Sequence, residues 1–220
     1  MCGRFTQQYT WAEIHALYRL TLPAIPNLRP NWNVAPTQDV GVVLADDGHL
    51  TYKPMRWGLV PAWAKDTKIG YSLINARVET VAEKPSFRSA WKARRCLIPA
   101  SGWFEWKTVS PEGKGKPLKQ PFYMSRKDGA PLTFAGLWER WGPDQLLSCT
   151  ILTTDASEGL RDLHGRMPLM LSNEDMNVWL SGGPPQLAED VDSVVQIFRV
   201  SPQMNKVGYN QPDCVAPLAN

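Results

Sequence analysis

The chain has 220 residues, of which 43% are hydrophobic and 20% are charged, a balance that is typical of globular domains and argues against a disordered or fibrous protein. Its formal net charge is only +3, so the overall charge does not by itself indicate a nucleic-acid partner, and any basic binding surface must be local. Charged residues interrupt the N-terminal region, and no segment approaches the roughly 20 apolar residues of a membrane span. We therefore expect a single domain over residues 1–220, in the cytoplasm and without a membrane partner.

The first predicted element is a helix from Thr10 to about Leu20. Thr10 and Glu13 have the spacing of a capping box, and the apolar residues that follow recur on one face. Four prolines between Thr21 and Pro36 predict an irregular connection after this helix.

Short strands and tight turns dominate the rest of the chain. Asp-Gly at positions 47 and 48 predicts a hairpin between Val40–Leu44 and Leu50–Tyr52, because this pair readily adopts the positive φ angles of a tight turn. Two more hairpins are predicted at Pro111–Pro117 and Lys127–Gly129, and a long loop is expected at 58–71. Further strands are expected at Pro121–Ser125, Leu132–Trp138, Leu146–Thr153 and Met167–Leu171.

Short helices are expected at Phe87–Arg95, near Ser157–Leu163, and after Ser172, which has capping spacing to Asp175. Strands outnumber helices, and they do not alternate regularly with them. The sequence therefore predicts an α+β fold, a single domain with a barrel-like, mainly antiparallel β-sheet core flanked by short helices.

The four cysteines, at positions 2, 96, 149 and 214, are widely separated. They form no C-x-x-C pair and have no histidine at ligand spacing, so we expect neither a metal site nor a disulfide framework, and no cofactor. Cys2 stands apart for another reason. Removal of Met1 before this small residue would expose an α-amine beside a thiol, and this pair can condense with an aldehyde to a thiazolidine or attack an acyl group.

Three separated segments accompany the opening Met-Cys-Gly-Arg-Phe. They are Leu-Ile-Asn-Ala-Arg-Val-Glu-Thr at 73–80, Ser-Gly-Trp-Phe-Glu-Trp at 101–106 and Leu-His-Gly-Arg-Met-Pro at 163–168. In this combination and order the chain resembles the SOS-response-associated peptidase (SRAP) family, the abasic-site processing proteins. The resemblance implies an SRAP-like barrel fold, autoproteolytic exposure of Cys2, and a covalent link to abasic sites in single-stranded DNA that shields them, with no obligate protein partner.

The resemblance also implies individual roles. Cys2 would be the crosslinking nucleophile, Asn75 would position the N-terminus, Glu105 would act as acid and base, and His164 would aid proton transfer and reversal. The residues themselves support Glu105, because its aromatic neighbours would desolvate the carboxyl group, raise its pKa and let it donate a proton near neutral pH. The alternatives are an exposed Glu105, a structural His164 and an Asn75 that stabilises a turn.

Arginines in or beside these motifs are the candidate phosphate ligands, because guanidinium groups pair with phosphate oxygens. They are Arg4, Arg77, Arg88 and Arg166. Aromatic residues that could wedge or stack beside the lesion form a second set, which comprises Trp57, Trp63 and Phe87. Surface charge or an internal ion pair is the alternative for the arginines, and core packing is the alternative for the aromatic residues.

Two other functions fit parts of the pattern. N-terminal-nucleophile glutamine amidotransferases also begin Met-Cys-Gly and use Cys2 to attack an amide, but Arg4 and Phe5 replace the small apolar continuation expected there. A non-catalytic single-stranded DNA-binding module would use only stacking and phosphate contacts. Covalent capture of DNA separates these possibilities.

Overall fold

The computed structural model describes residues 2–21, 28–110, 117–186 and 190–218. Five of its strands close into a barrel, in which each strand pairs with the next and the last with the first. In order around the barrel they are β3 (Asp39–Asp46), β4 (His49–Trp57), β10 (Leu146–Asp155), β9 (Leu132–Trp141) and β6 (Arg95–Ala100). Only the β4–β10 pair of this ring is parallel. The expected barrel-like, mainly antiparallel core is confirmed.

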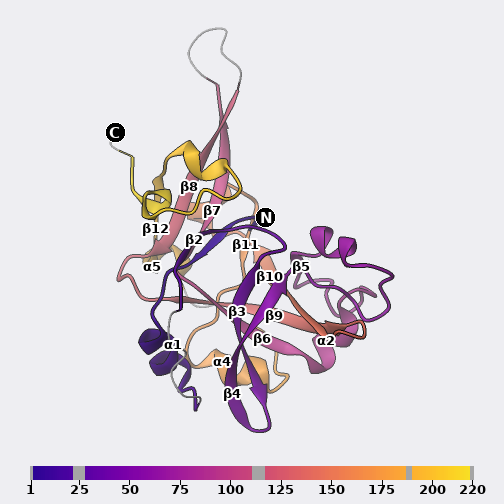
Figure 1. The fold of residues 1–220 in the computed structure, drawn as a ribbon. Helices are drawn as coiled ribbons and strands as arrows, with labels where there is room; N and C mark the ends of the chain where they lie inside the picture. The colour runs from indigo at the N-terminus through magenta and orange to yellow at the C-terminus, as the bar shows by residue number, and fades with distance from the viewer. Residues whose placement is uncertain (1, 22–27, 111–116, 187–189, 219–220) are drawn as a thin grey trace.

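A second, antiparallel sheet lies beside the barrel (Figure 1). Its order is β12 (Val195–Arg199), β8 (Leu118–Arg126), β7 (Gly102–Val109), β1 (Phe5–Gln7) and β2 (Asn31–Val34). Two short strands extend the barrel sheet along β10, namely the parallel β5 (Asn75–Arg77) and the antiparallel β11 (Arg166–Pro168). These pairings bring the N-terminal strand to β7, and they bring β5 and β11 to the two sides of β10.

Short helices flank the sheets, as predicted. They are α1 (Trp11–Tyr18), α2 (Arg88–Ala93), α3 (Glu158–Arg161), α4 (Asp175–Leu180), α5 (Val191–Val194) and the 3-10 turns η1 (Thr67–Ser72), η2 (Pro202–Asn205) and η3 (Pro212–Val215). The predicted capping box is present, because Thr10 N donates to Glu13 Oε2 at 2.6 Å and Glu13 N donates to Thr10 Oγ1 at 3.3 Å. Within the described residues, none of the helices has the length and apolarity needed to cross a membrane.

Two local predictions were wrong, and some strands were not predicted. Lys127–Gly129 forms a turn, but it joins β8 of one sheet to β9 of the other and does not make a hairpin. The connection predicted as irregular from Thr21 to Pro36 contains β2, while its residues 22–27 lie outside the described part of the chain. The strands β1, β5 and β12 were not predicted. β1 and β5 have only three residues each, so tertiary pairing rather than local propensity determines them.

The hairpin predicted around Pro111–Pro117 is confirmed by its strands, since Val109 of β7 pairs with Leu118 of β8. Residues 111–116 at its tip lie outside the described part of the chain. Figure 1 shows this hairpin projecting from the body of the molecule, with the N-terminus near its base.

Phe5 joins the N-terminal strand to the main core. Its ring lies edge-on to Trp57 at 4.9 Å and also contacts Phe134, with centroids 6.3 Å apart. Phe5, Trp57 and Phe134 are fully buried, and burial of a side chain of this size contributes about 1.5–3 kcal/mol. This packing anchors the chain three residues after Cys2, which limits how far the reactive end can move.

Candidate active site

Backbone pairing holds the N-terminal segment against β7. Phe104 N donates to Arg4 O at 3.0 Å, and Ser101 N donates to Thr6 O at 2.8 Å. Cys2 itself is fully buried, and its Sγ lies 3.7 Å from Arg4 O. The sequence motif at the N-terminus and the one at 101–106 therefore form adjacent strands.

Asn75 binds the same segment from the barrel side. It lies on β5, opposite Ile151 of β10, and its Nδ2 donates to Cys2 O at 2.8 Å. Its Oδ1 is buried and accepts no hydrogen bond within the described residues. The bond from Asn75 to the carbonyl of Cys2 restricts the backbone orientation of Cys2.

Glu105 is buried on β7, with only 4% of its surface exposed. Desolvation raises the pKa of its carboxyl group to about 7, although the positive amino terminus acts in the opposite direction. A carboxyl group with this pKa is half protonated near neutral pH, so it can donate or accept a proton there. The exposed alternative for Glu105 is wrong.

His164 lies in the turn between α3 and β11 and is half-buried. Arg166 N donates to His164 Nδ1 at 2.9 Å, and Arg166 O lies 3.2 Å from the same nitrogen. A neutral ring therefore accepts from the amide and carries its proton on Nε2, whereas a protonated ring can donate to the carbonyl oxygen. Because a proton on Nδ1 would face the Arg166 N–H, the 2.9 Å contact favours the neutral ring.

The charge of the amino terminus affects the pKa values of Cys2, Glu105 and His164. Burial raises the pKa of the Cys2 thiol well above its ordinary value, Glu105 raises it further, and the positive amino terminus partly offsets both. Burial also lowers the pKa of His164, and the amino terminus is the next largest cause. The thiol is therefore protonated at neutral pH and needs a base to react.

Two of the four candidate phosphate ligands are held inside the protein. Arg4 is 9% exposed, and its Nη1 donates to Asn33 Oδ1 at 2.7 Å and to Met204 O at 3.2 Å. Asn33 Nδ2 in turn donates to Met204 O at 2.9 Å and to Tyr209 O at 2.6 Å. Arg4 thus joins the N-terminal strand to the C-terminal segment, in place of the predicted phosphate contact.

Arg166 is also held by internal contacts. It donates to both carboxylate oxygens of Glu79, at 2.8 and 2.9 Å, and to Asp155 Oδ1 at 2.6 Å. A further bond, to Thr153 O at 2.6 Å, ties it to β10. These bonds support the internal ion-pair alternative and hold the turn that carries His164. The side chains of Arg77 and Arg88, by contrast, are on exposed residues.

The candidate aromatic residues also divide into buried and exposed ones. Trp57 is fully buried and Phe87 is 4% exposed, so neither ring can stack on a base without opening the core, and the core-packing alternative applies to both. Trp63 is 59% exposed. Tyr71, which sequence reasoning did not single out, is 63% exposed and lies on η1, with the Arg56 guanidinium 5.9 Å from its ring centroid. The sequence signal that could have identified Tyr71 was an aromatic residue in a loop that also carries several basic residues.

The contrast between Trp57 and Trp63 gives a direct prediction. Trp57→Ala should lower the free energy of unfolding by about 3–5 kcal/mol, because it leaves a large cavity in the core. Trp63→Ala should change it by less than about 1 kcal/mol, because the ring is mostly in solvent. Urea unfolding followed by circular dichroism checks both values. Equal losses in the two variants would contradict this assignment of core and surface.

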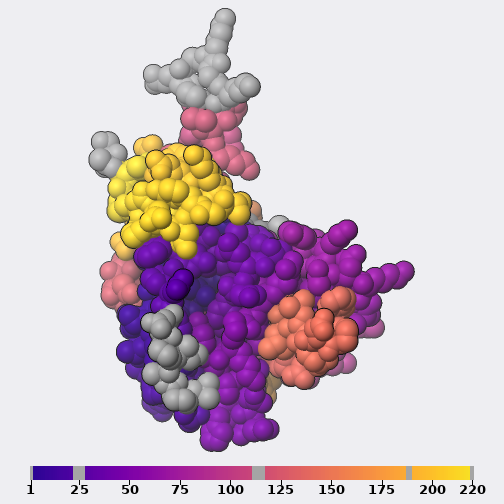
Figure 2. Space-filling model, in the orientation of Figure 1, coloured from indigo at the N-terminus to yellow at the C-terminus, as the bar shows by residue number. Residues whose placement is uncertain are grey.

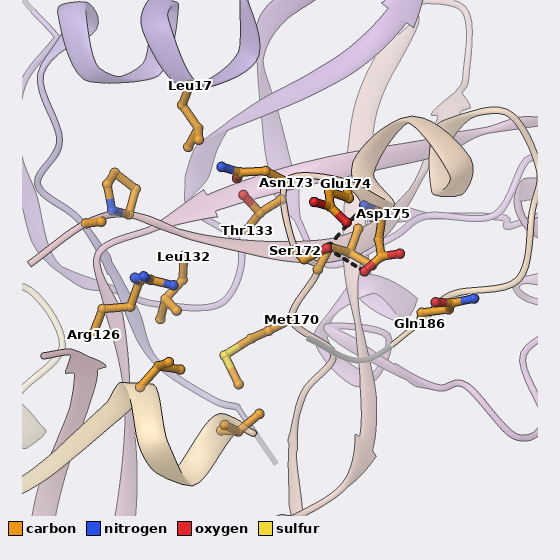
Figure 3. Close-up of a pocket in the computed structure, with 15 residues that line it drawn as sticks. Leu17, Arg126, Leu132, Thr133, Met170, Ser172, Asn173, Glu174, Asp175 and Gln186 are labelled. Atoms are coloured by element: carbon orange, nitrogen blue, oxygen red, sulfur yellow. Dashed lines mark hydrogen bonds between the residues drawn. The ribbon is translucent and has the colours of Figure 1, made fainter. Parts of the chain in front are cut away.

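A large pocket on the molecule is lined by residues other than the candidate catalytic ones. It has a volume of about 620 Å³, and its lining includes Arg126, Leu132, Met170 and Glu174. Figure 3 shows the Ser172 hydroxyl bonded to Asp175 on one wall of the pocket. The lining contains none of the candidate catalytic residues. In the described part of the chain, no group of three or more His, Cys, Asp and Glu side chains is placed to hold a metal ion.

Comparison with known proteins identifies the family. The family described as SOS response associated peptidase (SRAP) matches residues 1–207. The chain belongs to the SRAP family. Abasic site processing protein YoqW of Bacillus subtilis is 37% identical, with 98% of this chain and 99% of that protein covered. Abasic site processing protein YedK of Escherichia coli is also 37% identical, over 82% of this chain and 79% of that protein.

Solved structures show the same fold. A protein from Bacteroides thetaiotaomicron aligns with a TM-score of 0.80 at 24% identity and covers 99% of this chain and all of that one. A phage-related protein from Bordetella bronchiseptica aligns with a TM-score of 0.70 at 26% identity, over 90% of this chain and 94% of that one. The SRAP assignment over nearly the whole chain leaves the glutamine amidotransferase alternative without support.

Proposed function

We propose that this SRAP protein processes abasic sites in single-stranded DNA by forming a covalent thiazolidine crosslink through Cys2. The observation that carries the proposal is the hydrogen bond from Asn75 Nδ2 to Cys2 O, and the effect of the amino terminus on the pKa values of Glu105 and His164 supports it. Relatives in Bacillus subtilis, Escherichia coli and mammals are named abasic site processing proteins. Their names match the chemistry that an N-terminal aminothiol offers to an aldehyde.

The first step frees the reactive group. Hydrolysis of the Met1–Cys2 peptide bond consumes one water and releases methionine, and we propose that the protein performs this step itself. The α-amine of Cys2 then has a reference pKa of about 7.7–8.0, so a substantial fraction of it is neutral at physiological pH. Asn75, by donating to the carbonyl of Cys2, orients the amine and the thiol toward one reacting carbon.

The second step opens the abasic sugar, which exists mainly as a cyclic hemiacetal. Protonated Glu105 donates a proton to the ring oxygen while the anomeric hydroxyl loses one, so that an aldehyde and a free hydroxyl form without net proton transfer. The pKa of about 7 keeps enough of the protonated carboxyl group at neutral pH for this role.

The third step joins protein and DNA. The amine adds to the aldehyde carbon, and loss of one water gives an imine. The Cys2 sulfur then adds to the imine carbon while the imine nitrogen gains the proton that the thiol loses, and in this proposal His164 carries that proton. The result is a five-membered thiazolidine. An imine at this carbon can promote elimination of the adjacent phosphate, a lyase reaction, whereas the saturated ring carbon cannot, so ring closure protects the strand.

The proposed DNA surface uses the exposed candidates. Arg77 and Arg88 would contact phosphates, while Trp63 and Tyr71 would stack on bases next to the lesion. Arg77 follows Asn75 by two residues on β5, so a phosphate bound there lies close to the N-terminal segment.

A substrate comparison tests the proposal. Single-stranded DNA with an abasic aldehyde should give a heat-stable protein–DNA adduct on a denaturing gel. The same oligonucleotide with a tetrahydrofuran analogue, which has no aldehyde, should bind with similar affinity and give no adduct. Binding of both oligonucleotides without an adduct from either would favour the non-catalytic binding module. Release of ammonia from glutamine would instead revive the amidotransferase.

A further inference from the structure

We propose that the projecting part of the β7–β8 hairpin binds the DNA strand beside the abasic site, through Lys107 on a phosphate and Leu118 against a base or sugar. This inference rests on the proposed function and adds a second contact surface to it. The two residues lie on the hairpin face that carries Glu105.

The strand register determines which side chains share that face. Glu105 pairs with Phe122, Lys107 with Gln120 and Val109 with Leu118, in an unbroken antiparallel ladder. Side chains two residues apart on a strand point to the same side, separated by roughly 7 Å. Lys107 therefore follows Glu105 directly on one face, and Val109 and Leu118 continue that face outward.

The opposite face is different. Trp106 pairs with Pro121 and Thr108 with Lys119, and Trp106 Nε1 donates to Asn205 Oδ1 at 2.6 Å. Residues of η2 therefore pack on this side of the hairpin. On the Glu105 face, the buried Gln120 Nε2 donates to Val200 O at 2.8 Å. A ligand at the Glu105 carboxyl group approaches from the other side, where Lys107 is exposed.

The outer hairpin has few contacts of its own. The β12 pairing covers β8 only from Phe122 to Arg126, and the β1 pairing covers β7 only at Gly102 and Trp103. Figure 2 shows a rose-coloured segment that projects beyond the yellow C-terminal segment. An isolated two-stranded ribbon is marginally stable, yet here it exposes Leu118 to 60% and Val109 to 37%. Exposed apolar side chains on an unsupported ribbon indicate a surface that gains stability from a partner.

The charge of the outer hairpin favours a nucleic-acid partner. The described outer residues 106–110 and 117–120 include Lys107 and Lys119 and no acidic side chain. Neither lysine forms an ion pair with another described residue. Because the face of Lys107 continues from Glu105, a strand whose abasic sugar reaches Glu105 would present its neighbouring phosphate and base to Lys107 and Leu118.

Lys119 provides a matched control, because it lies on the same hairpin, carries the same charge and is also exposed, but is on the opposite face. Affinity is measured by fluorescence anisotropy on single-stranded DNA that carries the tetrahydrofuran analogue, so no covalent step contributes. Lys107→Ala should weaken binding roughly fivefold, about 1 kcal/mol, and reduce the salt dependence by about 0.7 in log–log slope. Lys107→Arg should restore affinity, Leu118→Ser should weaken it, and Lys119→Ala should leave it unchanged.

Equal affinities of Lys107→Ala and wild type, or equal losses in Lys107→Ala and Lys119→Ala, would overturn the inference. Thermal melting of each variant shows whether the fold is intact. Failure of the proposed function has a different signature, since wild-type protein would then bind the analogue but form no adduct with the aldehyde-bearing strand.

Discussion

Replacement of Cys2 with alanine is expected to abolish the heat-stable adduct with abasic single-stranded DNA, a loss of at least about 100-fold in yield, because no sulfur remains to close the ring. The variant keeps a small residue after Met1, so cleavage by a methionine aminopeptidase should still expose an α-amine even though self-cleavage is lost. That amine can form an imine, which hydrolyses on heating. Borohydride, which reduces an imine to a stable amine, should therefore restore an adduct in Cys2→Ala.

Two measurements separate this result from simple misfolding. Cys2→Ala should bind the tetrahydrofuran-containing strand within about twofold of wild type, since Cys2 is buried and its loss removes no phosphate contact. Cys2→Ser gives a closer steric match and should also lose the heat-stable adduct. An equal yield of heat-stable adduct from wild type and Cys2→Ala would show that Cys2 is not the nucleophile.

Glu105→Gln is expected to slow adduct formation about 100-fold and to change its dependence on pH. General acid–base catalysis typically contributes a factor of about 100–10,000, and glutamine preserves the shape of the side chain without a transferable proton. DNA affinity should remain near that of wild type. Single-turnover rates on abasic single-stranded DNA measure the effect.

The pH profile follows from the signs of the two titrations. Adduct formation needs a protonated Glu105, so the rate falls as pH rises above about 7. It also needs a neutral α-amine, so the rate rises toward about 7.7–8.0. Wild type should show a bell-shaped profile, and Glu105→Gln should lose the descending alkaline limb. A bell-shaped profile that persists in Glu105→Gln would assign that limb to another group.

Glu139 offers a control for the loss of a buried carboxyl group. It is 6% exposed and pairs with Arg94 at 2.8 Å, with none of the candidate catalytic residues as a hydrogen-bond partner. Glu139→Gln should weaken that ion pair and lower stability, while the adduct rate of the folded protein and its pH profile stay unchanged. A loss of rate equal to that of Glu105→Gln would make the Glu105 effect a general consequence of core disruption.

Local signals in the sequence predicted local structure well. The capping box of α1 depends only on Thr10 and Glu13, which lie within one helical turn, and it forms as expected. The turn at Lys127–Gly129 shows the limit of such signals. Asp128 accepts bonds from Arg126 and from Ala130 N, as a turn residue should, but the direction of the next strand depends on which sheet receives it.

In the candidate site, too, local motifs identified residues but did not predict their tertiary contacts. Motifs identified Cys2, Asn75, Glu105 and His164, but no local pattern places Asn75 on the carbonyl of Cys2, because that contact depends on β5 pairing with β10 in the barrel. Residues distant in sequence also determine whether an arginine is held in internal contacts or is free to bind phosphate. Arg4 binds a backbone oxygen at Met204, a residue on η2 near the C-terminus. Burial, which decides between Trp57 and Trp63, likewise follows only from the assembled barrel.

Intact mass spectrometry after incubation with a defined abasic oligonucleotide tests the central claim most directly. The free protein should have the mass of the chain without Met1, and the adduct should equal that mass plus the oligonucleotide minus one water. Both values follow from removal of methionine and condensation of the Cys2 aminothiol with an aldehyde. An adduct on a chain that retains Met1, or no adduct on a chain that has lost it, would contradict the thiazolidine mechanism.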